Sequence, residues 1–302
     1  MNVLEARAPF DATEIRRYIY DGYLVILEPT RSSQALCALA RRLTEEAFAP
    51  LNPIDAQLNL PVERYVEILA DVKPRFIHHL EAKAHIRGIF EEVGFELDRT
   101  YFDVPRLRSM TNREYLSSGI ALSFHPHRDT WYSAPPQQIN WWLPVYEMSV
   151  ENGIAFHPEF WSAPIKNTSH VYNYEEWKRT SRGAAAQQIG KETRVQPEPQ
   201  EPVDMAAAYK PVVEPGALIL FSAAMLHSSI PNETQRTRFS IDFRTVDIED
   251  VASFTGAPNI DSQCTGTTLR DYLRSDTNEH IAEEVVGPYE AGIAALEMAP
   301  RI

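Results

Sequence analysis

The chain has 302 residues, of which 44% are hydrophobic, and it carries a formal net charge of −13. That length and apolar content suffice for a sizeable core, which we expect to form one domain over residues 1–302. The acidic balance disfavours nucleic acid and anionic membrane surfaces as partners, and no apolar run approaches the roughly 20 residues that span a bilayer. We therefore expect a cytoplasmic protein that acts on a small molecule, and the two cysteines, Cys37 and Cys264, fit a reduced compartment.

Residues 10–100 have the patterning of a helical region. Asp11 or Thr13 can cap a first helix that continues through Tyr20 and ends at Gly22, and residues 23–27 form an apolar strand. Apolar residues at helical spacing predict further helices at 32–48, 62–69 and 79–93.

From residue 101 to 246 the pattern changes to short apolar runs that are separated by turn residues. These runs predict strands at 139–146, 154–157, 217–222 and 239–246, with turns at Asn152-Gly153 and Pro215-Gly216. Short strands that are punctuated in this way favour a β-sandwich or barrel over a βαβ sheet.

Two segments lie outside this strand pattern. Residues 162–212 form a long insertion with a proline-rich loop at 196–202 and a short helix at 174–182, and so long an insertion is typical of a lid. Residues 247–302 predict a C-terminal extension with helical stretches at 268–273 and 289–298, on which a homodimer could be built.

His127, Asp129 and His227 are the candidate metal ligands. On an extended strand, residues two apart point to the same face, so that His127 and Asp129 would present an imidazole and a carboxylate together. With the distant His227 they would form the 2-His-1-carboxylate triad of non-haem Fe(II) oxygenases. His125 is a rival ligand, because a His-x-His pair is typical of cupins. The glutamate and second histidine that a cupin needs do not follow, so we interpret His125 as a buried, hydrogen-bonded histidine.

The strand that follows His227 has one polar and one apolar face. Alternation places Phe239, Ile241 and Phe243 toward the core, and Arg238, Ser240, Asp242 and Arg244 on the opposite face. Two arginines on one face require a hydrated or ligand-filled cavity. There the Arg238 guanidinium could bind a carboxylate with two hydrogen bonds, and the Ser240 hydroxyl could add a further donor.

Together these motifs resemble the Fe(II)/2-oxoglutarate-dependent oxygenases, and within them the phytanoyl-CoA hydroxylase-like family. The resemblance covers about residues 10–246. The segments that carry it are Asp21-Gly22-Tyr23, His127-x-Asp129, Trp142 with Glu151-Asn152-Gly153, Pro215-Gly216, His227 to Pro231-Asn232, and Arg238-x-Ser240. It implies a mainly β fold with α-helices, in which helices flank a double-stranded β-helix (jelly-roll) core.

The resemblance also implies the cofactors and their contacts. Fe(II) would be bound by His127, Asp129 and His227, with 2-oxoglutarate and O2 as co-substrates. Arg238 and Ser240 would bind the distal carboxylate of 2-oxoglutarate. By position, Asn140 matches the family's polar residue near the other carboxylate, and Trp142 lies on the same strand face. After the Asn-Gly turn the family often continues with Pro-Gly-Ser-His, whereas this chain has Phe156-His157-Pro158-Glu159, so that part of the pocket rim does not carry over.

The activity that the resemblance implies is hydroxylation of an unactivated C–H of a small molecule, in natural-product metabolism. Asp129 argues against the related halogenating branch, where a small residue replaces the carboxylate. Desaturation, epoxidation and ring closure by the same site are alternatives, as are a non-catalytic jelly-roll protein that binds a metal or ligand and a zinc hydrolase. Candidate substrate contacts are Trp131 and Tyr132, just past Asp129, and Arg244 for an anionic group.

Overall fold

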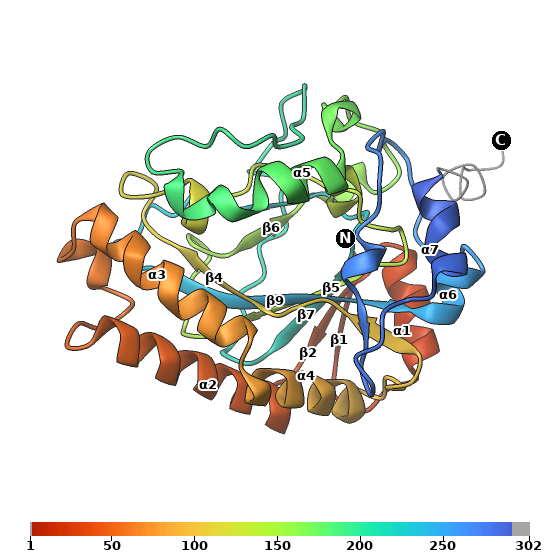
Figure 1. The fold of residues 1–302 in the computed structure, drawn as a ribbon, viewed down its shortest axis with the longest axis horizontal. Coiled ribbons are helices and arrows are strands. Elements are labelled where there is room, and N and C mark those ends of the chain that lie inside the picture. Colours follow the sequence, from red (N-terminus) through yellow and green to blue (C-terminus); the bar gives the residue numbers. More distant parts are fainter. Residues whose placement is uncertain (1, 292–302) are drawn as a thin grey trace.

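The structure, a computed structural model, describes residues 2–291, and a large mixed sheet runs through its centre (Figure 1). In spatial order the sheet contains β1 (Val3–Ala6), β2 (Leu24–Leu27), β7 (Leu218–Ser222), β5 (Ile139–Pro144), β9 (Arg238–Asp247), β3 (Thr100–Phe102) and β10 (Leu273–Arg274), and β4 (Arg106–Met110) also pairs with β9. Strands β1 and β2 are parallel, and the other pairs are antiparallel.

A second, two-stranded sheet of β6 (Ile154–Phe156) and β8 (His227–Ser229) lies over one face of the large sheet. A buried cluster joins the two sheets, because Phe156 from β6 packs with Phe221 from β7 and Trp142 from β5. The prediction of a jelly-roll core with flanking helices is confirmed.

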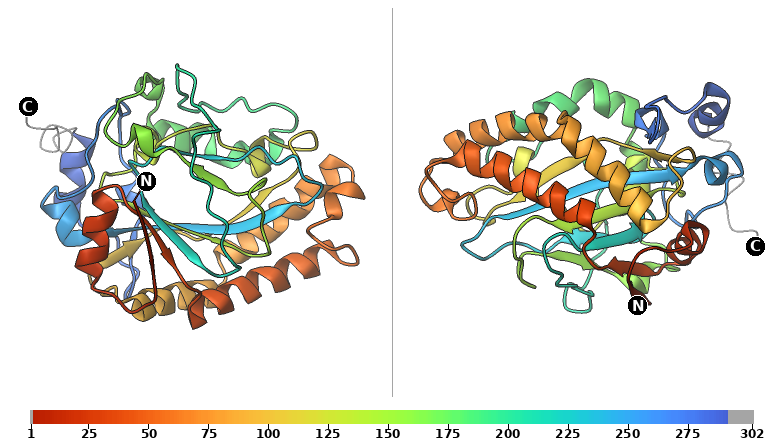
Figure 2. Two further views of the ribbon diagram at one scale, coloured as in Figure 1. Left: turned by 180° about the vertical axis from the view of Figure 1, so that it is seen from behind. Right: turned by 90° about the horizontal axis from the view of Figure 1, so that it is seen from below.

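Four helices precede most of the sheet in sequence: α1 (Ala12–Tyr20), α2 (Arg31–Phe48), α3 (Val62–Ile77) and α4 (Leu80–Val93). Helices α2, α3 and α4 lie side by side over the other face of the large sheet (Figure 2). Helix α3 is longer than predicted, since it continues past residue 69 and through Pro74. The buried Val72 and Phe76 extend its apolar stripe over that additional length and supply the packing that holds it.

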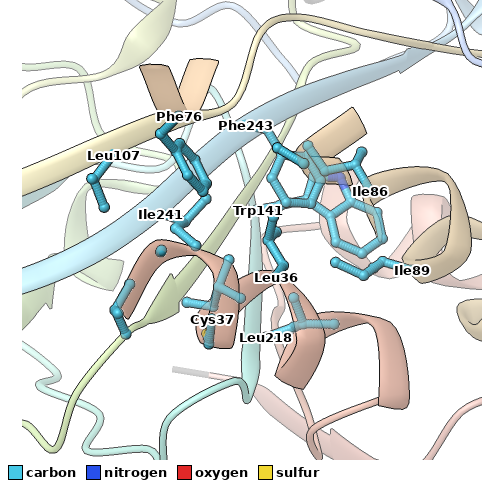
Figure 3. Packing of buried hydrophobic residues seen from close by; sticks show 14 of the residues in the cluster. Leu36, Cys37, Phe76, Ile86, Ile89, Leu107, Trp141, Leu218, Ile241 and Phe243 are labelled. Atoms are coloured by element: carbon cyan, nitrogen blue, oxygen red, sulfur yellow. The ribbon is translucent and has the colours of Figure 1, made fainter. Parts of the chain in front are cut away.

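The main core fills the space between these helices and the large sheet (Figure 3). Leu36 from α2 and Ile86 from α4 meet Trp141 from β5 and Phe243 from β9, whose rings stack at 5.5 Å. Phe239, Ile241 and Phe243 are fully buried, which confirms the alternation predicted for β9. Each such side chain stabilises the fold by about 1.5–3 kcal/mol, so the core fixes which face of β9 carries its polar residues.

The insertion at 162–212 carries one short helix, α5 (Tyr174–Thr180). The C-terminal segment contains α6 (Ile248–Ala252) and α7 (Glu283–Glu290), and the helix predicted at 268–273 is wrong. A 3-10 turn there leads into β10, whose pairing with β3 extends the sheet. The helix predicted at 289–298 lies largely outside the described residues. Other 3-10 turns are Ala56–Leu58, Gly119–Ala121, Asp129–Tyr132, Pro158–Phe160, Ser169–Val171 and Arg182–Gln187.

Among residues 2–291, no helix combines the length and the apolarity that crossing a membrane requires.

Candidate active site

A β-bridge brings His127 and His227 together. The backbone N–H of each donates to the carbonyl of the other at 2.9 Å, and the two imidazole rings lie with centroids 4.4 Å apart. Residues that are 100 positions apart in sequence therefore become direct neighbours through two backbone hydrogen bonds. This pairing places His127 beside His227, the first residue of β8, which pairs with Phe156 of β6 as well.

Asp129 completes the cluster, although not from the extended strand that the sequence predicted. It begins the 3-10 turn Asp129–Tyr132, which turns its side chain back toward the histidines. Its Oδ1 lies 3.4 Å from Nε2 of His127 and 3.8 Å from Nε2 of His227. One candidate ligand atom from each of the three buried residues lies within 4.8 Å of the others, which is a spacing that one metal ion can bridge.

Both histidines are oriented by backbone carbonyls two residues before them. Nδ1 of His127 lies 2.8 Å from the carbonyl of His125, and Nδ1 of His227 lies 2.9 Å from that of Met225. Because a carbonyl only accepts, each Nδ1 carries the proton and each Nε2 presents a lone pair. His125 does not join the cluster, because its own ring nitrogen faces the Pro197 carbonyl at 2.7 Å.

The electrostatics of the cluster favour a carboxylate at Asp129 and a neutral imidazole at His227, the protonation states that bind metals. Burial, and secondarily the neighbouring His127, lower the pKa of His227 to about 3. Burial alone would raise the pKa of Asp129, but contact with His127 and the charge of Arg244 hold it well below its usual range.

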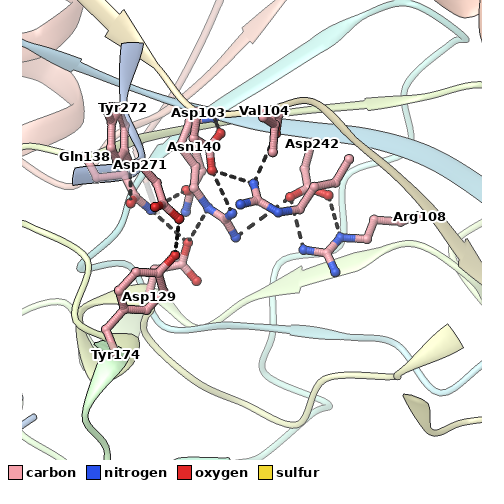
Figure 4. A network of polar contacts seen from close by, with 12 residues as sticks. Asp103, Val104, Arg108, Asp129, Gln138, Asn140, Tyr174, Asp242, Asp271 and Tyr272 are labelled. Carbon is pink, nitrogen blue, oxygen red and sulfur yellow. Dashed lines mark hydrogen bonds and ion pairs between the residues drawn. The ribbon is translucent and has the colours of Figure 1, made fainter. Parts of the chain in front are cut away.

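A buried polar network holds the second carboxylate oxygen of Asp129 (Figure 4). Nε2 of Gln138 donates to Oδ2 at 2.9 Å and also to Oδ1 of Asn140 at 2.8 Å. Nε of Arg244 lies 3.5 Å from the same Asp129 oxygen. With Oδ2 held in this way, Oδ1 is the oxygen that faces the histidines.

Arg238 and Ser240 lie on the polar face of β9, as predicted. Nη1 of Arg238 donates to the Gly153 carbonyl at 3.1 Å, and its guanidinium carbon lies 5.4 Å from the centre of the Trp142 ring. Among residues 2–291, the buried Arg238 Nε, Ser240 Oγ and Asn140 Nδ2 have no hydrogen-bond partner. Two of these residues, Arg238 and Asn140, line the same cavity as the triad, and their unpaired donors fit an acceptor-rich ligand such as a dicarboxylate. Burial lowers the pKa of Arg238 to about 10, at which it remains a cation at neutral pH.

The triad opens into a cavity of about 440 Å³ that Arg238, Asn140 and Trp142 also line. Of the predicted substrate contacts, Tyr132 and Arg244 line this cavity. The prediction for Trp131 is wrong: the side chain is fully buried with Ile165 and Leu226, where Nε1 donates to Asp261. The 3-10 turn sends adjacent residues in different directions, so that Tyr132 faces the cavity and Trp131 does not.

Several residues of the site were not predicted from the sequence. Gln138 could have been found, because it is two residues before Asn140 and directly precedes the strand that carries Asn140. Tyr272, whose hydroxyl donates to Gln138, carries no local signal. The insertion also contributes cavity-lining aromatic residues, among them Tyr172 and Trp177.

The sequence model of the family described as phytanoyl-CoA dioxygenase (PhyH) matches residues 18–240. Among solved structures, the chain is similar to EvdO2 from Micromonospora carbonacea var. aurantiaca complexed with 2-oxoglutarate, at 15% identity over 81% of this chain and 94% of that one, with a TM-score of 0.46. It is also similar to EctD from S. alaskensis with bound Fe, at 15% identity over 86% and 82% of the chains and a TM-score of 0.39. A search of the curated proteins finds no match. The family match covers most of the chain and includes the triad, so the chain belongs to the PhyH family of Fe(II)- and 2-oxoglutarate-dependent oxygenases.

Proposed function

We propose that this protein hydroxylates an unactivated C–H bond of a small molecule in natural-product metabolism. In this proposal Fe(II) is held by His127, Asp129 and His227. The distal carboxylate of 2-oxoglutarate is bound by Arg238 and Ser240, and Asn140 contacts its other carboxylate beside Trp142.

One observation carries the proposal: the metal cluster and the unpaired donors of Arg238 and Asn140 line one cavity, and the unpaired Ser240 hydroxyl lies two residues from Arg238 on the same strand. Arg238 Nε, Ser240 Oγ and Asn140 Nδ2 would each cost about 1–3 kcal/mol if they stayed unpaired in the working enzyme. A keto acid that reaches from Arg238 to the triad would pair them. A zinc hydrolase has no use for a buried arginine at this position.

When bound, Fe(II) and 2-oxoglutarate supply O2 activation and oxidative decarboxylation to succinate and CO2. The chain itself contributes binding, orientation and exclusion of water. The backbone bridge between His127 and His227 fixes the two imidazoles, and Gln138 fixes the carboxylate of Asp129. Because Asp129 is a carboxylate, it occupies the position that a halogenating enzyme leaves to halide.

The test is succinate formation by the full chain with added Fe(II) and 2-oxoglutarate, together with product mass over a panel of metabolites. We expect succinate only when both are added, and a product that gains one oxygen atom. Asp129→Ala should abolish succinate formation, whereas Asp98→Ala, at an exposed position outside the cavity, should not.

The alternatives give different results in the same assay. Loss of two hydrogens from the product would indicate desaturation or ring closure, and NMR of an oxygenated product would distinguish an epoxide from an alcohol. A non-catalytic binding protein would bind 2-oxoglutarate without forming succinate. Unchanged succinate formation in Asp129→Ala would refute the triad assignment.

A further inference from the structure

The cavity has an excess of positive charge in a chain of net charge −13. Seven lysines and arginines line it, against four aspartates. Fe(II) and the 2-oxoglutarate dianion together would add no net charge, so the excess would remain in the loaded enzyme. An anionic ligand is therefore favoured inside a protein whose overall charge would repel one.

Most of these cations are already neutralised within residues 2–291. Five of the seven form ion pairs: Arg106 and Arg244 with Asp103, Arg108 with Asp242, Arg182 with Asp271, and Arg194 with Glu192. The two that have no carboxylate oxygen within 4 Å among these residues are Arg238 and Lys73. In the proposed function, 2-oxoglutarate provides the counter-ion of Arg238. Lys73 is then the one cation among these seven that has no counter-ion in the described part of the chain.

Lys73 projects from α3 into the cavity beside Arg108 of β4. Its ammonium donates to the backbone carbonyl of Ile120. The Arg108 guanidinium is held by Asp242, with Nε at 2.6 Å from Oδ1 (Figure 4). Burial, and secondarily the charge of Arg108, lower the pKa of Lys73 to about 7. An anion between Lys73 and Arg108 would accept a charge-assisted hydrogen bond from the Lys73 ammonium, which would offset the cost of burying that charge.

Aromatic side chains line the cavity from Arg108 to beyond the triad, and we call Phe124, Tyr132 and Tyr172 the aromatic wall. The Arg108 guanidinium carbon lies 5.7 Å from the centre of the Phe124 ring, and Phe124 lies 5.1 Å from the ring of His127. Tyr132 follows at 6.4 Å from Phe124, and Tyr172 lies 5.2 Å from Tyr132. A flat, apolar body along this wall would pass directly beside a metal ligand.

We propose that the substrate carries a carboxylate or phosphate, bound by Lys73 beside Arg108, on a ring-bearing apolar body that lies along Phe124, Tyr132 and Tyr172. This inference rests on the proposed function, since it assigns the substrate class of the same site. The anion anchors one end of the substrate, and the aromatic wall directs the rest of it past His127.

The test is isothermal titration calorimetry on the full chain loaded with Ni(II) and saturating 2-oxoglutarate, so that the Arg238 site is filled and no turnover occurs. The probes are phenylbutyrate, phenylbutyl phosphate and the neutral phenylbutyramide. We expect at least one anionic probe to bind about tenfold more tightly than the amide. Tighter binding of the carboxylate or of the phosphate shows which anion the site takes.

Variants of Lys73 then locate the anion. Lys73→Met should weaken the anionic probe about tenfold and leave the amide and 2-oxoglutarate affinities unchanged, and Lys73→Arg should restore most of the loss. Lys83→Met, on the neighbouring helix and outside the cavity, is the matched control and should bind all ligands like the wild type.

Three results would overturn the proposal. These are failure of both anionic probes to bind, equal affinity of the amide and the anions, and a Lys73→Met variant that loses 2-oxoglutarate affinity, which would place Lys73 on the co-substrate. Because the readout is binding, it is separable from the proposed function, which fails when the wild type forms no succinate.

Discussion

The Tyr272 hydroxyl lies 2.6 Å from Oε1 of Gln138, and this contact fixes the direction of the Gln138 amide. Asp129 can only accept, so the Gln138 nitrogen must face it and the Gln138 oxygen must accept from Tyr272. The same Gln138 nitrogen also contacts Asn140. Tyr272 lies in the C-terminal segment, beyond the end of the family match at residue 240. It thus orients an amide that joins Asp129 to Asn140.

Tyr272→Phe should weaken metal binding about tenfold, because the Gln138 amide loses the bond that orients it toward Asp129. The measurement is calorimetric titration with Ni(II) in the presence of 2-oxoglutarate. Tyr146→Phe is the control, since it removes a tyrosine hydroxyl that lies 3.0 Å from the Thr44 hydroxyl, and Tyr146 does not line the cavity. Equal losses in the two variants would mean that Tyr272 only stabilises the fold.

Arg238→Met should weaken 2-oxoglutarate binding by roughly 10–100-fold, since it removes charge-assisted hydrogen bonds of about 1.5–3 kcal/mol. Ser240→Ala should cost less, about fivefold, because it removes a single neutral donor. The measurement is 2-oxoglutarate titration of the Ni(II)-loaded chain. Arg236→Met, at an exposed position just before the same strand, should bind like the wild type. A wild-type affinity in Arg238→Met would place the co-substrate elsewhere.

Local patterning was enough to predict the parts of this site that lie on β9. The alternation of Arg238 and Ser240 with Phe239 and Ile241 fixes two faces, and burial of one face determines the other. Asn140 was predicted only by its position in the family pattern, and burial of its neighbour Trp141 in the core is consistent with that placement.

The rest of the site depends on contacts between segments that are distant in sequence. No periodicity predicts that Tyr272 reaches Gln138, or that Lys73 lies beside Arg108. The predicted helix ended at residue 69, before Lys73, whereas packing of Val72 and Phe76 continues the helix through Pro74. The 3-10 turn that begins at Asp129 likewise leaves only Tyr132, of the two predicted substrate contacts Trp131 and Tyr132, facing the cavity.

His157 should make the protein less stable in mild acid. It is fully buried, its Nε2 lies 3.2 Å from the Ser228 hydroxyl, and burial together with the charge of Lys210 lowers its pKa to about 4. Between its ordinary pKa of about 6.5 and pH 4, the unfolded state binds the proton more readily. The free energy of unfolding should therefore fall by about 3 kcal/mol over that window and not further below it.

The check on His157 is the difference in urea-unfolding free energy between wild type and His157→Gln, measured from pH 7 to pH 4. We expect that difference to shrink as the pH falls, because only the wild type loses stability through this group. His170→Gln, at an exposed position, should give a constant difference. A difference that stays constant for His157→Gln as well would show that this histidine does not titrate on unfolding.

Lys73 should lower the stability of the ligand-free protein, because its buried charge has no counter-ion until an anionic ligand binds. Its folded pKa of about 7 is below the ordinary lysine value of 10.5. Below pH 7 the ammonium is charged in both states and the full cost is present, whereas between pH 7 and about 10.5 the unfolded state binds more protons and stability recovers. Lys73→Met should therefore be more stable than the wild type by at least about 1 kcal/mol at pH 7, and this gap should close toward pH 10.

The gap in stability is measured by urea unfolding at both pH values. The control, Lys83→Met, should show no such pH-dependent gap. If Lys73→Met were less stable than the wild type at pH 7, the Lys73 ammonium would stabilise the fold through its bond to the Ile120 carbonyl. Burying its charge would then not destabilise the ligand-free protein.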